Sequence, residues 1–117
     1  MEMATIARWL IAFFFIASGA GKIFAFRQSS TILASIGFPI PNFFLTAIIA
    51  VEIAGGLGLL FNVWTSAVAV ALILFLIFAT VTIHARFVRD PVNGTDQIVH
   101  IIKNIAIIGG LINFVAF

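Results

Sequence analysis

The sequence predicts an all-α integral membrane protein, a bundle of four membrane-spanning helices with a short interfacial helix between spans 1 and 2. The first observation is composition: 63% of the 117 residues are hydrophobic and 9% are charged, with a mean hydropathy of +1.28. Soluble domains average about 45–50% apolar and about 25% charged residues. This composition therefore excludes most soluble enzymes, disordered proteins and nucleic-acid binders.

The second observation is length. Four spans of roughly 20 residues would use about 80 positions, so we expect residues 1–117 to form a single membrane domain without a separate extramembrane domain. The bilayer is then the principal partner.

The first span is predicted over residues 4–26. Arg8 and Lys22 lie within it, but both side chains are long enough to reach opposite interfaces. Residues 27–36 combine a polar and an apolar half, which is typical of a short amphipathic interfacial helix. Residues 37–42 contain one glycine and two prolines, and they interrupt the helical pattern.

The second and third spans share an uncharged stretch, residues 53–83. As one helix this stretch would be about 46 Å long, whereas the hydrocarbon core is about 30 Å thick. A turn is therefore required, and we place it at residues 61–64, because Asn62 tolerates turn geometry and Trp64 favours the interface. The predicted spans are 42–61 and 64–87.

The fourth span is predicted over residues 97–117, after a polar loop at 89–96. In this loop Asn93 and Gly94 indicate a tight turn, and Thr95 or Asp96 can cap the following helix.

The basic residues predict an orientation. Four spans place both termini on one side of the membrane, where Arg8 is the only basic residue. The opposite side holds the others: Lys22, Arg27, Arg86, Arg89 and Lys103. The positive-inside rule then places both termini outside the cytoplasm. The count is five basic residues against one, and it falls to three against one if Lys22 and Lys103 are functional residues and are left out of it.

Glu52 is the most informative candidate residue, because it lies near the predicted bilayer midplane. A carboxylate at that depth must find a cation or take up a proton, and intramembrane ionisable residues generally mark functional sites. We predict that Glu52 handles protons or binds a ligand. The alternative is a structural ion pair or a neutral acid bonded to a neighbouring helix.

Further candidates lie on the first span. Arg8, Phe15, Ser18 and Lys22 recur at helical spacing on one face, which we expect to point into the bundle. Lys22 is either a ligand-binding residue or a side chain that reaches the cytoplasmic interface. Arg8 is predicted to bind ligand as well.

The third and fourth spans supply the remaining candidates. His84 lies near the end of the third span, where it can transfer protons. His100, Lys103 and Asn104 share one face at the start of the fourth span. Asn104 either contacts ligand or bonds to another helix. We predict no metal site, because neither histidine stands at the spacing of a metal-binding motif.

These groups are expected to converge on a polar cavity, with Glu52 at its floor and residues 27–36 and 38–39 at its rim. A cavity with one acid, two lysines and a histidine inside an apolar wall suits an amphipathic ligand, such as a quinone head group or a small organic anion. In this reading Glu52 and His84 are the catalytic residues, and Lys22 and Lys103 stabilise a developing anion. The sequence has no cysteine, so electrons must come from a bound cofactor or a partner.

The order of these motifs resembles the DoxX family of small bacterial membrane proteins. The residues that carry the resemblance are Arg8, Ser18-Gly19, Lys22, Gly37-Phe38-Pro39, Glu52, Gly55-Gly56-Leu57, Thr80, His84, Lys103-Asn104 and Gly109-Gly110. The resemblance implies a four-helix membrane bundle in a bacterial inner membrane. It also implies a link to quinone chemistry, because the family takes its name from a subunit of a thiosulfate:quinone oxidoreductase.

Two classes of function remain open at this point. The first is a subunit or accessory of a quinone-linked oxidoreductase system, with a quinone as cofactor and an oxidoreductase as partner. The second is a non-enzymatic protein, either a small-molecule transporter, which would be helped by homo-oligomerisation, or a membrane adaptor that assists assembly.

Overall fold

The structure is all-α, as predicted. The computed structural model describes residues 2–35, 37, 39–84 and 94–116, and for residues 83, 84 and 94–97 it describes the backbone alone. In chain order the helices are α1 (Met3–Phe24), α2 (Phe26–Ser35), α3 (Pro41–Leu60), α4 (Thr65–Ala79), the π-helical turn η1 (Thr80–His84) and α5 (Gly94–Ile112). No strand occurs within these ranges.

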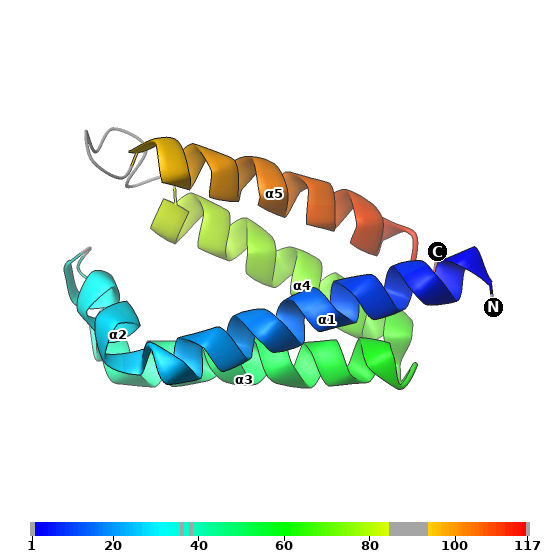
Figure 1. Ribbon diagram of the computed structural model, residues 1–117, viewed down its shortest axis with the longest axis horizontal. Coiled ribbons are helices and arrows are strands. Elements are labelled where there is room, and N and C mark those ends of the chain that lie inside the picture. The colour runs from blue at the N-terminus through cyan, green and yellow to red at the C-terminus, as the bar shows by residue number, and fades with distance from the viewer. Residues whose placement is uncertain (1, 36, 38, 85–93, 117) are drawn as a thin grey trace.

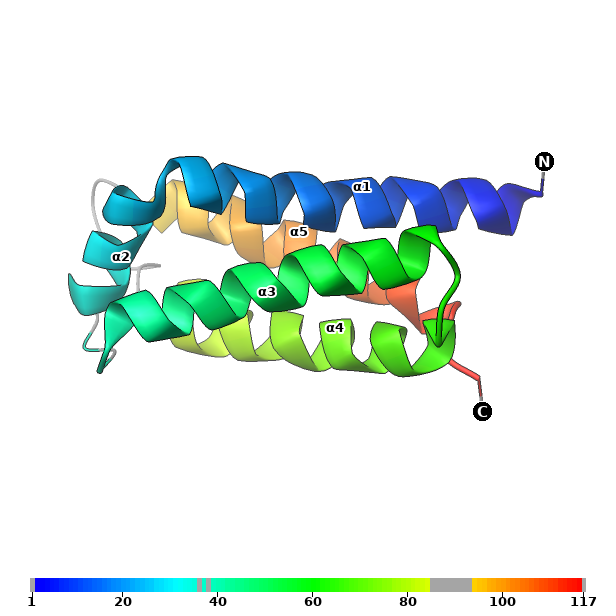
Figure 2. The same cartoon turned by 90° about the horizontal axis from the view of Figure 1, so that it is seen from below.

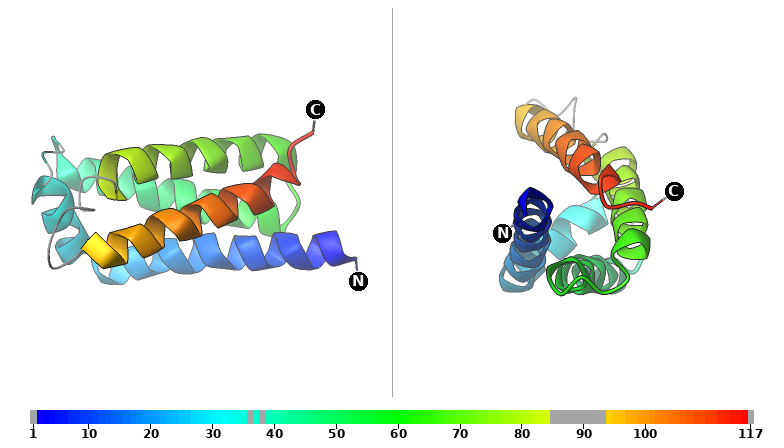
Figure 3. Two further views of the ribbon diagram at one scale, coloured as in Figure 1. Left: turned by 90° about the horizontal axis from the view of Figure 1, so that it is seen from above. Right: turned by 90° about the vertical axis from the view of Figure 1, so that its right-hand side faces the viewer.

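Four long helices run along the molecule, and α2 lies across one end of them (Figures 1 and 2). Both chain ends lie at the opposite end (Figure 1). The end-on view in Figure 3 shows the order α1, α3, α4, α5 around the bundle, and α1 packs most extensively against α3. The longest dimension is 43 Å, enough to cross a hydrocarbon core of about 30 Å.

Three helices in the described part of the chain are long and apolar enough to cross a membrane: Met3–Phe24, Pro41–Leu60 and Thr65–Thr82. Large apolar side chains are exposed along the outside of the long helices, among them Leu10, Phe13, Leu74, Ile102 and Ile105. Exposed apolar faces of this extent require lipid around the bundle.

The fourth apolar helix is shorter than predicted. Its apolar part is Ile98–Ile112, and α5 ends before the expected Phe117. Turn hydrogen bonds follow Ile112, and the Ala116 amide donates to Ser66 Oγ at 2.8 Å. After α5 the chain is therefore no longer helical and contacts the start of α4.

The two connections around α3 lie where the sequence places them. Asn62 and Trp64 adopt left-handed backbone conformations, with φ of 57° and 47°, so the turn predicted at residues 61–64 is confirmed. Before α3, Gly37 has φ of 87° and Ile40 has φ of 50°. Pro41 then starts the helix, where its missing amide hydrogen is not needed.

Some predicted boundaries differ from the structure. The interfacial helix begins at Phe26, directly after α1, and α5 begins at Gly94 instead of residue 97. The predicted loop at residues 89–96 therefore already contains the first helical turn of α5. The end of the third span and the loop before Gly94 lie outside the described residues.

Small residues bring α1 and α3 close together. A Cβ added at Gly19 would lie 2.6 Å from the Ile53 side chain, and one added at Gly56 would lie 3.0 Å from the Ala12 carbonyl oxygen. A larger residue at either position would therefore force its neighbours to shift. The two helices therefore pack with their backbones almost in contact, as is common between membrane helices.

A candidate polar cavity at the α2 end of the bundle

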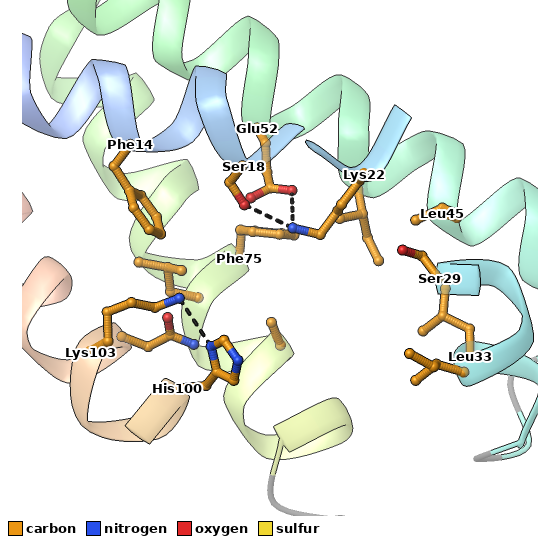
Figure 4. A pocket seen from close by; sticks show the side chains of 15 residues that line it. Phe14, Ser18, Lys22, Ser29, Leu33, Leu45, Glu52, Phe75, His100 and Lys103 are labelled. Carbon is orange, nitrogen blue, oxygen red and sulfur yellow. Dashed lines mark hydrogen bonds and ion pairs between the residues drawn. The ribbon is translucent and has the colours of Figure 1, made fainter. Parts of the chain in front are cut away.

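The interior of the bundle changes character along its length. Near the chain ends it is a tightly packed apolar core of Ala12, Phe15, Leu59, Ala69, Leu72, Leu76 and Leu111. Toward α2 it opens into a cavity of about 290 Å³. Each of the five α-helices contributes to its lining, which consists of Phe14, Ser18, Lys22, Ser29, Ile32, Leu33, Leu45, Ile48, Glu52, Phe75, Leu76, Ala79, His100, Lys103 and Asn104 (Figure 4).

Glu52 and Lys22 form an ion pair at the α1–α3 side of this cavity. Lys22 Nζ lies 2.9 Å from Glu52 Oε1 and donates to Ser18 Oγ at 2.8 Å (Figure 4). The Glu52 side chain is only 4% exposed, whereas that of Lys22 is 33% exposed. The pair therefore joins a buried carboxylate to a partly solvated ammonium.

The hydrogen-bonding capacity of Glu52 is not filled by the protein. Within the described part of the chain, Oε1 is buried and accepts no hydrogen bond of normal geometry, so the Lys22 charge is its main compensation. A buried oxygen in this condition normally has an additional donor. Glu52 can therefore accept a hydrogen bond from a group in the cavity.

Lys103 faces the same cavity from α5. Its Nζ lies 3.2 Å from His100 Nδ1 and 5.0 Å from the centroid of the Phe14 ring. An ammonium group can only donate, so in this contact His100 Nδ1 is the acceptor. Lys103 also connects α5 to α1 through its cation–π contact with Phe14.

Asn104 is buried and connects α5 to the end of α4. Its Nδ2 donates to Thr80 Oγ1 at 3.1 Å. Thr80 is the first residue of the π-helical turn η1, and such turns frequently occur at functional sites. The bond is of the kind expected for a polar residue between membrane helices, and it fixes the α5 wall of the cavity.

The structure separates Arg8 from the other site residues. The guanidinium donates to the carbonyl oxygens of Leu59 and Leu60, the latter at 3.0 Å, near the chain ends. These carbonyls belong to the last turn of α3, where helical partners are missing, and Arg8 is absent from the cavity lining. Its expected approach to the cavity is therefore not observed.

The other predicted site residues are either lining residues of the cavity or lie outside the part of the chain whose side chains are described. Glu52, Lys22, Lys103 and Asn104 line one cavity, whereas the side chain of His84 lies outside the described residues. Sequence reasoning placed His100 on the face of Lys103 without including it in the site, although the three-residue spacing of these two residues contained that information.

The side chains that line the cavity determine which kind of group it can hold. Among the described residues there is no group of three histidine, cysteine, aspartate or glutamate side chains that could hold a metal. The cavity instead offers ammonium donors, one carboxylate and aromatic walls. This combination fits a small polar ring or another head group with an apolar continuation.

Fold and cavity together define a small helical membrane protein with a polar, partly charged chamber inside one end of its bundle. The sequence profile of the DoxX family matches residues 3–85. The chain therefore belongs to the DoxX family.

A comparison with curated proteins gives a consistent result. The chain is similar to "Inner membrane protein YqjF" of Escherichia coli (strain K12), with 29% identity over 107 residues, which covers 92% of this chain and 77% of the relative. No solved structure matches the chain. The apolar helices and the inner-membrane relative support a bacterial inner membrane protein.

Proposed function

We propose that the chain is a subunit or accessory of a quinone-linked oxidoreductase system and that its cavity receives the quinone head group. One observation carries the proposal. The buried Glu52 carboxylate, held by Lys22 at 2.9 Å, faces an apolar-walled chamber in a membrane-embedded bundle. This is the arrangement that a proton-coupled reaction of a lipid-soluble ring requires.

The chamber fits such a head group in size and chemistry. Its volume of about 290 Å³ is at the lower end of small-molecule pockets, which suits a substituted ring without its tail. Phe14, Phe75 and Leu76 supply apolar contact. Lys103 can donate to a ring oxygen, and the unfilled acceptor on Glu52 can receive a ring hydroxyl.

When bound, a quinone supplies a reversible acceptor for two electrons and two protons. In this proposal Glu52 accepts or delivers a proton at its carboxylate, and Lys22 holds that carboxylate in place. Lys103 stabilises negative charge on the ring oxygen that it contacts. His84 is proposed as a second proton-transferring group on the strength of the sequence alone.

The electrons are proposed to come from a partner oxidoreductase. The sequence contains no cysteine, so thiol–disulfide exchange within this chain does not contribute. The positive-inside count favours placing the α2 end, and with it the cavity, on the cytoplasmic side. A soluble or membrane-bound partner would then dock at that end.

The proposal is tested by quinone binding to the purified protein in lipid nanodiscs. Decylubiquinone is titrated and bound ligand is measured by equilibrium separation for the wild type, for Glu52→Gln and for the control Glu2→Gln, which changes an exposed acid outside the cavity. Loss of a charged hydrogen bond should weaken binding by roughly tenfold or more in Glu52→Gln, whereas Glu2→Gln should match the wild type.

Two results would overturn the proposal. Absence of saturable binding by the wild type would remove the quinone as ligand. Equal affinity of Glu52→Gln and the wild type would remove Glu52 from the site and leave a membrane adaptor, in which the ion pair only holds α1 against α3.

A further inference from the structure

The formal charges around the cavity do not cancel. Lys22 and Glu52 neutralise each other at 2.9 Å, and the His100 imidazole that contacts Lys103 supplies no negative charge. Lys103 remains. Counted over the described lining residues, the cavity therefore has a net charge of one positive unit.

The groups that contact Lys103 do not supply the missing negative charge. Its neighbours are an imidazole nitrogen at 3.2 Å and the face of Phe14 at 5.0 Å. A cation–π contact stabilises an ammonium by about 0.5–2 kcal/mol, which is less than the several kcal/mol lost when an ion is moved into an apolar interior. Within the described residues no carboxylate therefore contacts Lys103, and an anion in the cavity would compensate its charge.

The walls restrict what that anion can be. Phe14, Leu33 and Phe75 are apolar, and the bundle stands in lipid, so a small hydrophilic ion would lose its hydration without gaining apolar contact. An amphiphile meets both requirements, because its charged head can reach Lys103 while its apolar part contacts these side chains.

We propose that the cavity selects amphiphiles with a single negative charge and that Lys103 is the residue that recognises this charge. The inference rests on the proposed function, since it assumes that the same cavity is the ligand site, and it adds the ligand's charge class. Two sources share this chemistry. One is a quinone ring with an ionised hydroxyl group, and the other is a long-chain carboxylate.

The test compares two matched ligand pairs on the protein in nanodiscs of zwitterionic lipid at pH 7.5. The first pair is a 2-hydroxy-3-alkyl-1,4-naphthoquinone and its methyl ether, and the second is dodecanoate and methyl dodecanoate. Within each pair only the charge changes substantially. For the wild type we expect the anion to bind roughly 10- to 100-fold more tightly than its neutral partner in at least one of the two pairs. The pair that shows this preference identifies the source.

Variants connect this preference to one residue. Lys103→Met should abolish the preference, so that the anion and its neutral partner bind with similar affinity, and Lys103→Arg should preserve the preference because the charge remains. Arg27→Gln serves as the matched control, because it removes a positive charge from α2 outside the cavity lining. It should behave as the wild type.

Each alternative outcome decides a separate point. If Lys103→Met keeps the preference, or if Arg27→Gln abolishes it, Lys103 is not the selecting residue and the inference is overturned. Glu52-dependent binding of decylubiquinone without any charge preference would overturn the inference and leave the proposed function standing. Charge-selective binding of dodecanoate without binding of any quinone would support the inference and overturn the proposed function. Circular dichroism of each variant and the Lys103→Arg result separate misfolding from loss of selection.

Discussion

The ion pair between Lys22 and Glu52 permits a quantitative prediction about stability. At 2.9 Å and an effective dielectric constant of about 20, Coulomb's law gives an attraction of about 6 kcal/mol. Lys22 is one-third exposed, so water and lipid head groups replace part of this attraction when the pair is broken. We therefore expect Lys22→Met to lower the free energy of unfolding by about 2–4 kcal/mol, near the lower end of values for buried pairs.

The assay is a double-mutant cycle in mixed micelles. Wild type, Lys22→Met, Glu52→Gln and the double variant are titrated with sodium dodecyl sulfate, and loss of helix is followed by circular dichroism. The double variant should be destabilised by less than the sum of the single variants, because each single variant leaves one unpaired charge behind and the double variant leaves none. Additive effects would refute the reasoning, since they would show that the two side chains do not interact in the folded protein.

Three further predictions use the same unfolding assay. Gly56→Ala should destabilise the protein by about 1–3 kcal/mol, because its Cβ would lie 2.7 Å from Ile16, whereas Gly109→Ala meets nothing within 4 Å and should be neutral; equal effects would contradict the close packing of α1 on α3. Arg8→Gln should lower stability by about 1–2 kcal/mol through lost hydrogen bonds to the end of α3, with unchanged quinone affinity; a loss of affinity would return Arg8 to the ligand site. Asn104→Ala should cost about 1 kcal/mol, and its effect should shrink in a Thr80→Val background if the 3.1 Å bond is its source.

The sequence predicts the site residues better than it predicts their distances. Hydropathy gives the depth of a residue in the membrane, and helical periodicity gives its face, so Glu52 and Lys22 could both be directed into the bundle. Arg8 shares a face with Lys22, but fourteen residues of helix separate them by about 21 Å. Face and depth must be read together, and Arg8 then belongs to the opposite end of the bundle.

A single sequence does not show which helices lie next to each other in the bundle. Periodicity places His100 and Lys103 on one face of α5, but it does not indicate that this face meets α1. That contact depends on the order α1, α3, α4, α5 around the bundle, which is decided by the fit of small residues such as Gly19 and Gly56. Side-chain packing of this kind has no signature in spacing alone.

The position of the Lys22–Glu52 pair within the first three helices has a consequence for biogenesis. These helices emerge from the ribosome before α5, so the two opposite charges can meet and enter the bilayer as a neutral unit, which reduces the penalty for exposing either to hydrocarbon. Lys103 follows later, with α5. It therefore enters the bundle when α1, α3 and α4, which form the other long walls of the cavity, have already been synthesised.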